Sequence, residues 1–204
     1  MKKIVTFLFL ISITGLVSTS CVSDNDYEIP TLRVPFFKED FQSAVNNTNL
    51  DLAGWTNFAE QGTWLWRERT FSGNGYAEFS SFGSGSTNVV WLISPAIDLK
   101  GFAKPTFKAS IAQHHLDVDS PNNSLEVLYS TDYDGTNVLT ATWKTIDANV
   151  PDRSISWYEF LKTTAVLPAY DGSVYIAFKF RGSGTDQTLD GAFQVDDVIL
   201  YNEN

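Results

Sequence analysis

Residues 174–180 read Val-Tyr-Ile-Ala-Phe-Lys-Phe. Every second side chain of this stretch, from Val174 to Phe180, is a large apolar one, and the positions between carry Tyr, Ala and Lys. Side chains alternate between the two faces of a strand, so this pattern is typical of a strand that buries one face. The stretch therefore predicts a strand of a sheet that packs on a core.

Similar short runs fill the chain from Phe36 onward, separated by clusters of Gly, Ser, Asn, Asp and Pro that indicate turns. The expected strands are 36–41, 63–71, 76–82, 89–93, 106–116, 124–130, 142–146, 174–180 and 193–201. Residues 156–166 also show helical spacing of apolar residues, but the surrounding strands favour an irregular strand pair. Because strands do not alternate with helices, we expect an all-β antiparallel β-sandwich of the jelly-roll type.

The composition limits the classes of function. The chain has 204 residues, of which 43% are hydrophobic and 14% aromatic, enough for one packed domain. Its formal charge of −10 has the wrong sign for contacts with phosphate backbones, so nucleic acid is not an expected partner. The single Cys excludes an intrachain disulfide framework and a cysteine-based zinc cluster.

The N-terminus carries the features of a targeting segment. Lys2 and Lys3 precede the apolar run 4–17, which is too short for an ordinary membrane-spanning helix, and small residues lead to Cys21. This arrangement resembles the lipobox of bacterial lipoproteins, in which the Cys is lipidated after cleavage, although Ser18 replaces the usual Leu. A plain secretory signal cleaved near Ser20 is the alternative.

The domain boundaries follow from this signal. We expect a lipoprotein signal peptide over 1–20, a lipidated N-terminus and tether over 21–35, and the jelly-roll domain over 36–204. The acidic residues just after Cys21 resemble the surface-export signal of Bacteroidetes lipoproteins, and an ordinary flexible N-terminus would look similar. The expected location is the outer membrane, facing outward, with attachment by the lipid alone.

Several motifs, taken in order, resemble those of the choice-of-anchor J family, which is related to the cleaved-adhesin domains of Bacteroidetes surface proteins. They are Phe37-Lys38-Glu39-Asp40-Phe41, Gly54-Trp55, Trp66 with residues 72–77, and the stretches 91–99, 125–135, 141–143, 174–178 and 195–198. The most specific are Leu-Ile-Ser-Pro-Ala-Ile-Asp-Leu at 92–99 and the terminal Val-Asp-Asp-Val. The resemblance spans about residues 36–201 and implies a sandwich similar to carbohydrate-binding modules and MAM domains, with a binding or accessory role.

The resemblance also implies a structural Ca²⁺. In related jelly rolls the two terminal strands lie side by side and hold the ion between them, which points to Glu39 and Asp196, with Asp40 and Asp197 as flanking acids. Carboxylate and carbonyl oxygens are the ligands that Ca²⁺ prefers. Strand alternation would turn one acid of each neighbouring pair inward. The alternative is that these acids are solvated or cap loops.

Catalysis has little support in the sequence. His114 and His115 are adjacent in an expected strand, so their side chains should point to opposite faces and should not share a site. The sequence contains none of the common nucleophile, zinc-helix, phosphate-loop or dinucleotide motifs. With 24 acidic residues a glycosidase pair of carboxylates is conceivable, but nothing identifies one. We therefore expect a protein that is not an enzyme.

Glycan binding would use exposed aromatic rings beside polar side chains, because the apolar face of a sugar stacks on such rings. Tyr133, at the tip of an expected turn, is the first candidate for a ligand-binding aromatic. Trp66 is the second: with Trp64 it forms either a core pair or a platform, and core packing is favoured.

The leading hypothesis is thus a cell-surface lipoprotein whose non-catalytic module binds a glycan or a host surface. One alternative is an assembly module that docks on another surface protein. The other is a hydrolase.

The anchoring hypothesis gives a direct test. Cys21→Ala removes the thiol that would receive the lipid, so the variant should move from the membrane fraction to the soluble fraction. Detergent-phase partitioning of the full chain measures this. If the variant partitions into detergent as the wild type does, lipidation of Cys21 is refuted.

Overall fold

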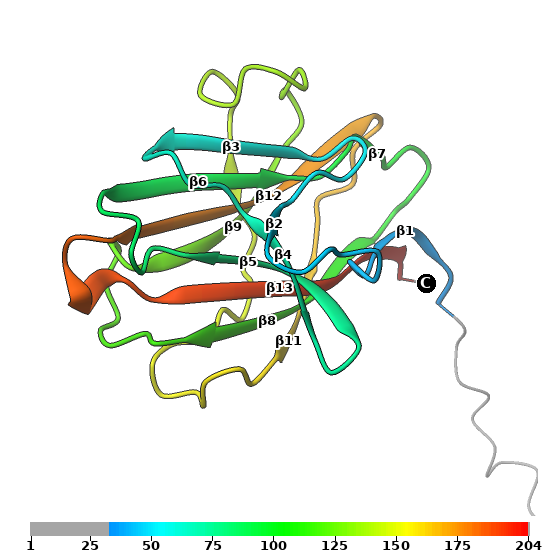
Figure 1. The fold of residues 1–204 in the computed structure, drawn as a ribbon. Helices are drawn as coiled ribbons and strands as arrows, with labels where there is room; N and C mark the ends of the chain where they lie inside the picture. Colours follow the sequence, from blue (N-terminus) through cyan, green and yellow to red (C-terminus); the bar gives the residue numbers. More distant parts are fainter. Residues whose placement is uncertain (1–32, 204) are drawn as a thin grey trace, which may run out of the picture. The chain divides into compact units, whose positions relative to one another are not determined.

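The computed structural model describes residues 33–203, which form two layers of antiparallel strands (Figure 1). The predicted signal peptide, the predicted lipidation site Cys21 and most of the tether lie outside the described residues. In the described part of the chain, no helix has the length and apolar character needed to cross a membrane.

Seven strands form one sheet. They are β1 (Pro35–Glu39), β2 (Thr48–Asn49), β4 (Arg67–Phe71), β5 (Asn74–Ser80), β8 (Pro105–His114), β11 (Leu161–Val166) and β13 (Ala192–Asn202). Their order is β11-β8-β13-β5-β4-β2, and β1 also pairs with β13. The hairpin between β4 and β5 turns through Ser72 and Gly73, both with positive φ, as a two-residue hairpin loop requires.

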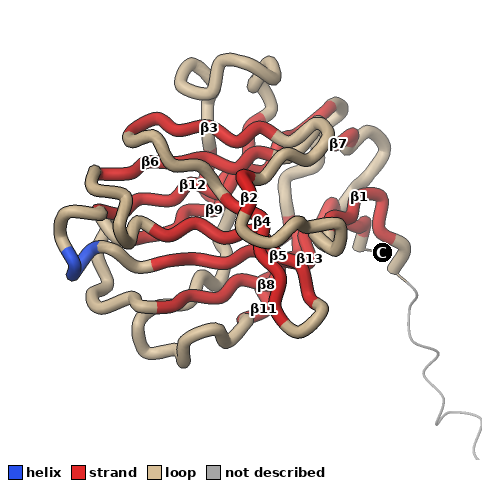
Figure 2. The backbone as a smooth tube through the Cα atoms, viewed as in Figure 1, coloured by secondary structure: helices blue, strands red, loops and turns tan. Residues whose placement is uncertain are grey.

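Six strands form the other sheet. They are β3 (Thr56–Gln61), β6 (Thr87–Ile93), β7 (Ile97–Asp98), β9 (Ser124–Ser130), β10 (Lys144–Thr145) and β12 (Ser173–Ser183). Their order is β10-β9-β12-β6-β3, with β7 also against β12. Figure 2 shows the strands in red and the short helical turn η1 (Gln187–Leu189) in blue. The predicted all-β antiparallel sandwich is confirmed.

The core lies between the two sheets and follows strand alternation. In β12 the side chains from Val174 to Phe180 that face inward are fully buried, as the sequence pattern predicts. In β8, Phe107, Ala109 and Ile111 face the same core. Trp66, just before β4, is fully buried beside the Phe79 ring, so its predicted role as a core residue is confirmed and it is no ligand platform.

The outer face of the six-stranded sheet is covered by the loop 131–143. Trp91, Ile93 and Leu128 on this face form a second apolar cluster with Tyr133 and Val138 of the loop. Tyr133 is only 5% exposed and packs against Trp143 and Tyr175, so the expectation of an exposed ligand-binding Tyr133 is wrong. Exposure was inferred from the position of Tyr133 in a loop, but this loop covers an apolar face of the sheet and buries the ring.

Two other segments differ in part from expectation. Residues 156–166 form no helix, as the surrounding strands favoured, but the segment is not a strand pair: 156–160 belong to a loop and the rest to β11, which pairs with β8. The strand β12 continues to Ser183, beyond the expected end at Phe180. Gly182 is needed there because a Cβ would lie 2.5 Å from the Ser81 hydroxyl and 2.6 Å from the Phe180 ring. The glycine marks close packing inside a strand.

The strand β13 changes partner in its middle. Residues 192–195 pair with β5, whereas residues 198–201 pair with β1 on the same side. Between these segments the register against β8 shifts by one residue, and Asp197 takes a positive φ of 50°. This is a β-bulge, which inserts one extra residue into a strand. The bulge brings the end of β1 and the start of β5 together at Asp196 and Asp197.

Candidate functional site

The outer face of the seven-stranded sheet carries an open hollow of about 610 Å³. Its volume lies within the range of small-molecule binding sites, about 300–1,000 Å³. The lining residues come from β4, β5, β8, β13 and the loop before β11; they are Arg69, Phe71, Asn74, Tyr76, Glu78, His114, Tyr158, Phe160 and Gln194. We call this the first hollow.

Strand alternation explains why these side chains meet. In β5, Ala77 and Phe79 face the core, so Asn74, Tyr76 and Glu78 face outward. Gln194 of β13 lies opposite Glu78 in the register of the two strands. Polar residues at outward positions of neighbouring strands thus converge on one patch.

Glu78 is the centre of a polar network on the floor of the first hollow. One carboxylate oxygen lies 3.1 Å from Nε of Arg69. The other accepts a hydrogen bond of 2.7 Å from Gln194 Nε2 and lies 3.4 Å from Nε2 of His114. Burial raises the pKa of the Glu78 carboxyl, but the hydrogen bonds from His114 and Gln194 and the charge of Arg69 outweigh it. The pKa of Glu78 therefore lies below its ordinary value, and the group is a carboxylate at neutral pH.

Aromatic rings surround this network. Tyr158 stacks on the His114 ring at a centroid distance of 4.7 Å and is 54% exposed. Phe160 makes an edge contact with Tyr76 across the hollow, at 6.0 Å. The first hollow thus combines exposed ring surface with a fixed set of donors and acceptors.

Gln113 fixes the loop that carries these rings. Its side-chain Nε2 donates to the backbone carbonyl oxygen of Ile155, and its own backbone carbonyl oxygen accepts from the backbone N–H of Tyr158. Gln113 is fully buried, so these two bonds are shielded from water. They hold Tyr158 over the sheet even though its φ is +65°, a conformation that non-glycine residues rarely adopt.

The two histidines lie together, which corrects the expectation that they point to opposite faces. The strand β8 ends at His114, and His115 takes a φ of +54°. This turn of the backbone breaks the alternation and brings the two Nδ1 atoms to 2.8 Å. His115 stacks on Trp157 at 4.1 Å, so each histidine ring supports one exposed aromatic ring of the loop.

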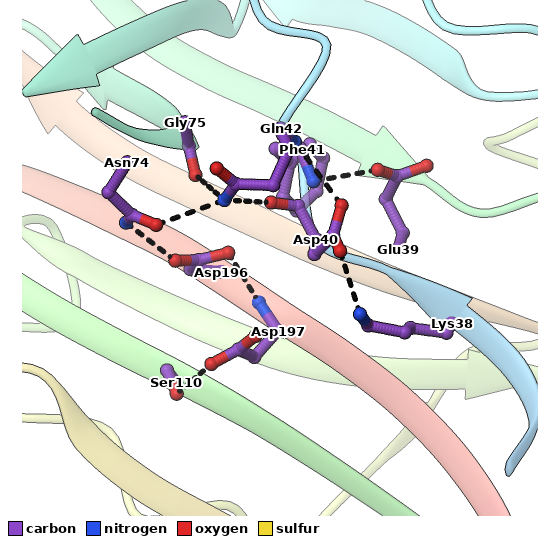
Figure 3. A network of polar contacts seen from close by, with 10 residues as sticks. All are labelled: Lys38, Glu39, Asp40, Phe41, Gln42, Asn74, Gly75, Ser110, Asp196 and Asp197. Carbon is purple, nitrogen blue, oxygen red and sulfur yellow. Dashed lines mark hydrogen bonds and ion pairs between the residues drawn. The ribbon is translucent and has the colours of Figure 1, made fainter.

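The predicted metal-binding acids lie beside the first hollow, at the bulge of β13 (Figure 3). Asp196 is 6% exposed; it accepts hydrogen bonds from Asn74 Nδ2 at 2.9 Å and from the backbone N–H of Asp197. Asp197 accepts from the hydroxyl of Ser110, which lies on the outer face of β8. Both acids therefore face outward, and the expected inward acid is absent because the bulge interrupts the alternation.

The end of β1 supplies the other two acids. Asp40 is bound by Lys38 Nζ at 2.7 Å, and this contact lowers the pKa of the Asp40 carboxyl. Glu39 accepts from the backbone N–H of Phe41 at 2.7 Å and makes no hydrogen bond or ion pair with Asp196 among the described contacts (Figure 3). The structure thus brings Asp40, Asp196 and Asp197 to one corner of the sheet, with Glu39 turned to the chain after β1.

Neutral oxygens also converge at this corner. The carbonyl oxygens of Asp40 and Gly75 and the side-chain oxygen of Asn74 all accept from Nε2 of Gln42. Gly75 allows this approach, because a Cβ there would collide with the carbonyl oxygen of Phe41.

The carboxylate of Asp196 has no ion-pair partner among residues 33–203. Burial and the charges of Asp197 and Asp40 raise its pKa. Across the same residues, no three His, Cys, Asp or Glu side chains are arranged to hold a metal. The donors fit Ca²⁺ in kind, as a mixture of carboxylate, amide and carbonyl oxygens.

The residues of the first hollow are not among the site residues predicted from the sequence. They are scattered over five segments, and only the pairing of β5, β13 and β8 brings Glu78, Gln194 and His114 together. The one local signal is the series of polar or aromatic residues at alternate positions of β5, from Asn74 to Ser80. Such a series marks a solvent-facing strand side and by itself indicates no ligand.

Comparisons with known proteins bear on the fold. No protein-family model matches the sequence, and no curated protein matches it either. The K3 cleaved adhesin domain of Lys-gingipain from Porphyromonas gingivalis W83 has a similar structure: TM-score 0.53, 17% identity, 84% of this chain and 99% of that domain covered. The K1 domain of the same protein has a TM-score of 0.49 and 23% identity, with 82% of this chain and 98% of that domain covered. A carbohydrate-binding module that recognises mannan has a TM-score of 0.44 and 13% identity, with 85% of this chain and 99% of that module covered. The likeness to K3 shows that the chain has the sandwich fold of a cleaved adhesin domain.

The Glu78 network predicts a pH-dependent contribution to stability. Glu78→Gln removes the charge that Arg69 and His114 contact, and a hydrogen bond to a charged group contributes about 1.5–3 kcal/mol. We expect the free energy of unfolding at pH 7 to fall by roughly that amount. Since the pKa of Glu78 is lowered in the folded state, its contribution is full above the ordinary value of 4.5 and is lost as the pH falls below it.

Denaturant unfolding of both proteins between pH 7 and pH 3 measures this difference. The control is Glu126→Gln, the same change at an exposed position of β9, which should alter the free energy of unfolding by less than about 0.5 kcal/mol. A Glu78→Gln variant that is as stable as the wild type at pH 7 would contradict the proposed network.

Proposed function

We propose that this chain is a cell-surface lipoprotein whose sandwich domain is a non-catalytic binding module, and that its first hollow binds a glycan. The observation that carries the proposal is the position of the Glu78 network directly beside the rings of Tyr76, Tyr158 and Phe160. A sugar presents C–H groups that stack on aromatic rings and hydroxyls that bond to fixed polar groups. Both kinds of partner are present within one hollow.

The polar groups suit hydroxyl ligands in particular. Glu78 offers acceptor oxygens, Arg69 offers donors, and Gln194 and Asn74 offer both. Their mutual hydrogen bonds fix these side chains before a ligand arrives, which lowers the entropy cost of binding. Such a preorganised arrangement favours a ligand that is itself a rigid ring.

A non-catalytic role agrees with the chemistry of the first hollow. Glycoside hydrolases use two carboxyl groups, one of which keeps its proton through a raised pKa. Glu78 is the one carboxylate among the described residues that line this hollow, and its pKa is lowered. We therefore propose binding without cleavage, and release of reducing sugar ends from a bound polysaccharide would favour the hydrolase instead.

Two further parts of the proposal come from the sequence. Residues 1–21 support lipid attachment at Cys21, and the acidic residues after it support an outward-facing position on the outer membrane. The fold shared with the K3 domain, which is named an adhesin domain, is consistent with a surface role. Docking on another surface protein through the same face is the alternative.

We also propose that Ca²⁺ binds at the corner formed by Asp40, Asn74, Gly75, Asp196 and Asp197. The support is the gathering of oxygen atoms there and the lack of an ion-pair partner for Asp196. When bound, the ion would supply positive charge to the carboxylates where β1, β5 and β13 meet. Its role would be structural.

The calcium proposal is tested by thermal unfolding. A metal that binds only the folded state stabilises it, so a chelator should lower the melting temperature of the wild-type chain. Asp196→Asn should remove most of this difference, whereas Asp171→Asn, an exposed acid elsewhere, should keep it. Without a metal, Asp196→Asn would instead stabilise the protein by removing a buried charge beside Asp197 and Asp40. A wild type unaffected by chelator, with a more stable Asp196→Asn variant, contradicts the proposal.

The glycan proposal is tested on an array of neutral and acidic glycans with the full chain in detergent. Tyr158→Ala removes an exposed ring, so affinity for the bound glycan should fall about tenfold, the scale of one aromatic contact. The melting temperature should change little, because Tyr158 is 54% exposed. Tyr170→Ala, an exposed tyrosine outside the first hollow, should bind as the wild type does. If no glycan binds the wild type at millimolar concentration, docking on a protein becomes the leading function.

A further inference from the structure

A second hollow of about 410 Å³ lies next to the first. His114 lines both, so the two hollows are neighbours on the outer face of the seven-stranded sheet. The second hollow is also lined by Ser80, Phe82, His115 and Asp190. Like the first hollow, it is lined by an exposed aromatic ring, by histidine and by at least one carboxylate.

The two hollows follow one another along β5. Outward residues Tyr76 and Glu78 line the first hollow, and Ser80, the next outward residue, lines the second together with Phe82 just beyond the strand. The strand from Asn74 to Ser80 measures about 20 Å, taking about 3.4 Å for each residue. A ligand that fills both hollows must therefore be elongated, and a glycan of that length has several sugar rings.

The residue shared by the two hollows, His114, belongs to a group of stacked rings. Tyr158 rests on His114 and Trp157 rests on His115, so one face of each loop ring is held while more than half of each side chain is exposed. The contact between the two histidine Nδ1 atoms joins these stacks into one unit. A chain of sugar rings that crosses from one hollow to the other passes this unit.

The charges select the class of sugar chain. The second hollow carries Asp117 and Asp190, and burial together with the Asp117 charge raises the pKa of the Asp190 carboxyl. In the first hollow the Arg69 charge is already matched by Glu78. Asp117 and Asp190 make no ion pair among residues 33–203, so carboxylated or sulfated sugars would meet these carboxyl groups in the second hollow, whereas neutral sugars would not be repelled by them.

We propose that the two hollows are successive subsites of one groove that binds several consecutive units of a linear, neutral polysaccharide, with His114 and Tyr158 at the boundary. This inference rests on the proposed glycan-binding function and adds to it the length and charge class of the ligand. Phe82 provides ring surface at the far end of the groove.

The test measures affinity against ligand length. Ladders of xylo-, manno- and cello-oligosaccharides with two to six units are titrated calorimetrically into the full chain in detergent, with oligogalacturonates as the acidic arm. For the neutral ladder that binds, affinity should rise at least tenfold from the disaccharide to the hexasaccharide. The oligogalacturonates should bind more weakly than neutral chains of equal length.

Substitutions locate the two subsites. Phe82→Ala removes a side chain that is 70% exposed, so folding should be unaffected. It should weaken binding of the hexasaccharide on the order of five- to tenfold, the scale of one aromatic contact, and leave binding of the disaccharide unchanged. Tyr158→Ala should weaken binding of both lengths. Tyr170→Ala is the matched control and should weaken neither.

The outcomes separate this inference from the function on which it rests. Binding that does not grow stronger beyond the disaccharide, or a hexasaccharide affinity unchanged by Phe82→Ala, would show a single subsite and overturn the inference while leaving glycan binding intact. Tighter binding of oligogalacturonates would overturn the neutral class. If neither these ladders nor any array glycan binds, the proposed function and the inference both fall.

Discussion

The exchange of partners along β13 is the constraint on which the remaining structure depends. The strand pairs with β8 along one side for its whole length, but its other side is shared between β5 and β1. Two strands can pair with successive parts of the same side of a third strand only if the chain turns away from that strand where the first ends and the second begins. The bulge at Asp196 and Asp197 and the close approach of Gly75 to Phe41 accomplish this.

This exchange places the two candidate sites next to each other. Because β5 begins at the bulge, its first outward residue, Asn74, contacts Asp196 on one side and lines the first hollow on the other. The corner formed by Asp196 and its neighbours fixes where β5 starts. The start of β5 in turn fixes the positions of Tyr76 and Glu78. The position of the first hollow therefore depends on the geometry of the bulge.

The sequence allowed the sandwich to be predicted because its signal is local. Alternating apolar residues, as in 174–180, mark a buried strand face whatever the neighbouring strand is. The acids of the corner were recognised for another reason: their motifs resemble those of a known family. Nothing local marks the β13 bulge, so the inward acid that strand alternation suggested was wrong.

The first hollow could not be predicted, because its residues are joined only by strand pairing. His114 and His115 show the same limit. A single positive φ at His115 reverses the direction that alternation assigns to its ring, and two adjacent residues do not reveal such a φ. The prediction that Tyr133 is exposed was wrong because loop residues are usually exposed, whereas this loop packs on Trp91, Ile93 and Leu128 of the sheet.

The loop 131–143 has a consequence for how the molecule tolerates change. Surface loops commonly accept insertions and sequence drift, because few of their atoms are packed. This loop places Tyr133 and Val138 in an apolar cluster on the sheet, so it should vary as little among relatives as a core strand does. Its loss would expose Trp91, Ile93 and Leu128 together, a contiguous apolar patch of the kind that causes aggregation. In terms of mutational tolerance, residues 131–143 belong to the interior of the protein although they form part of its surface.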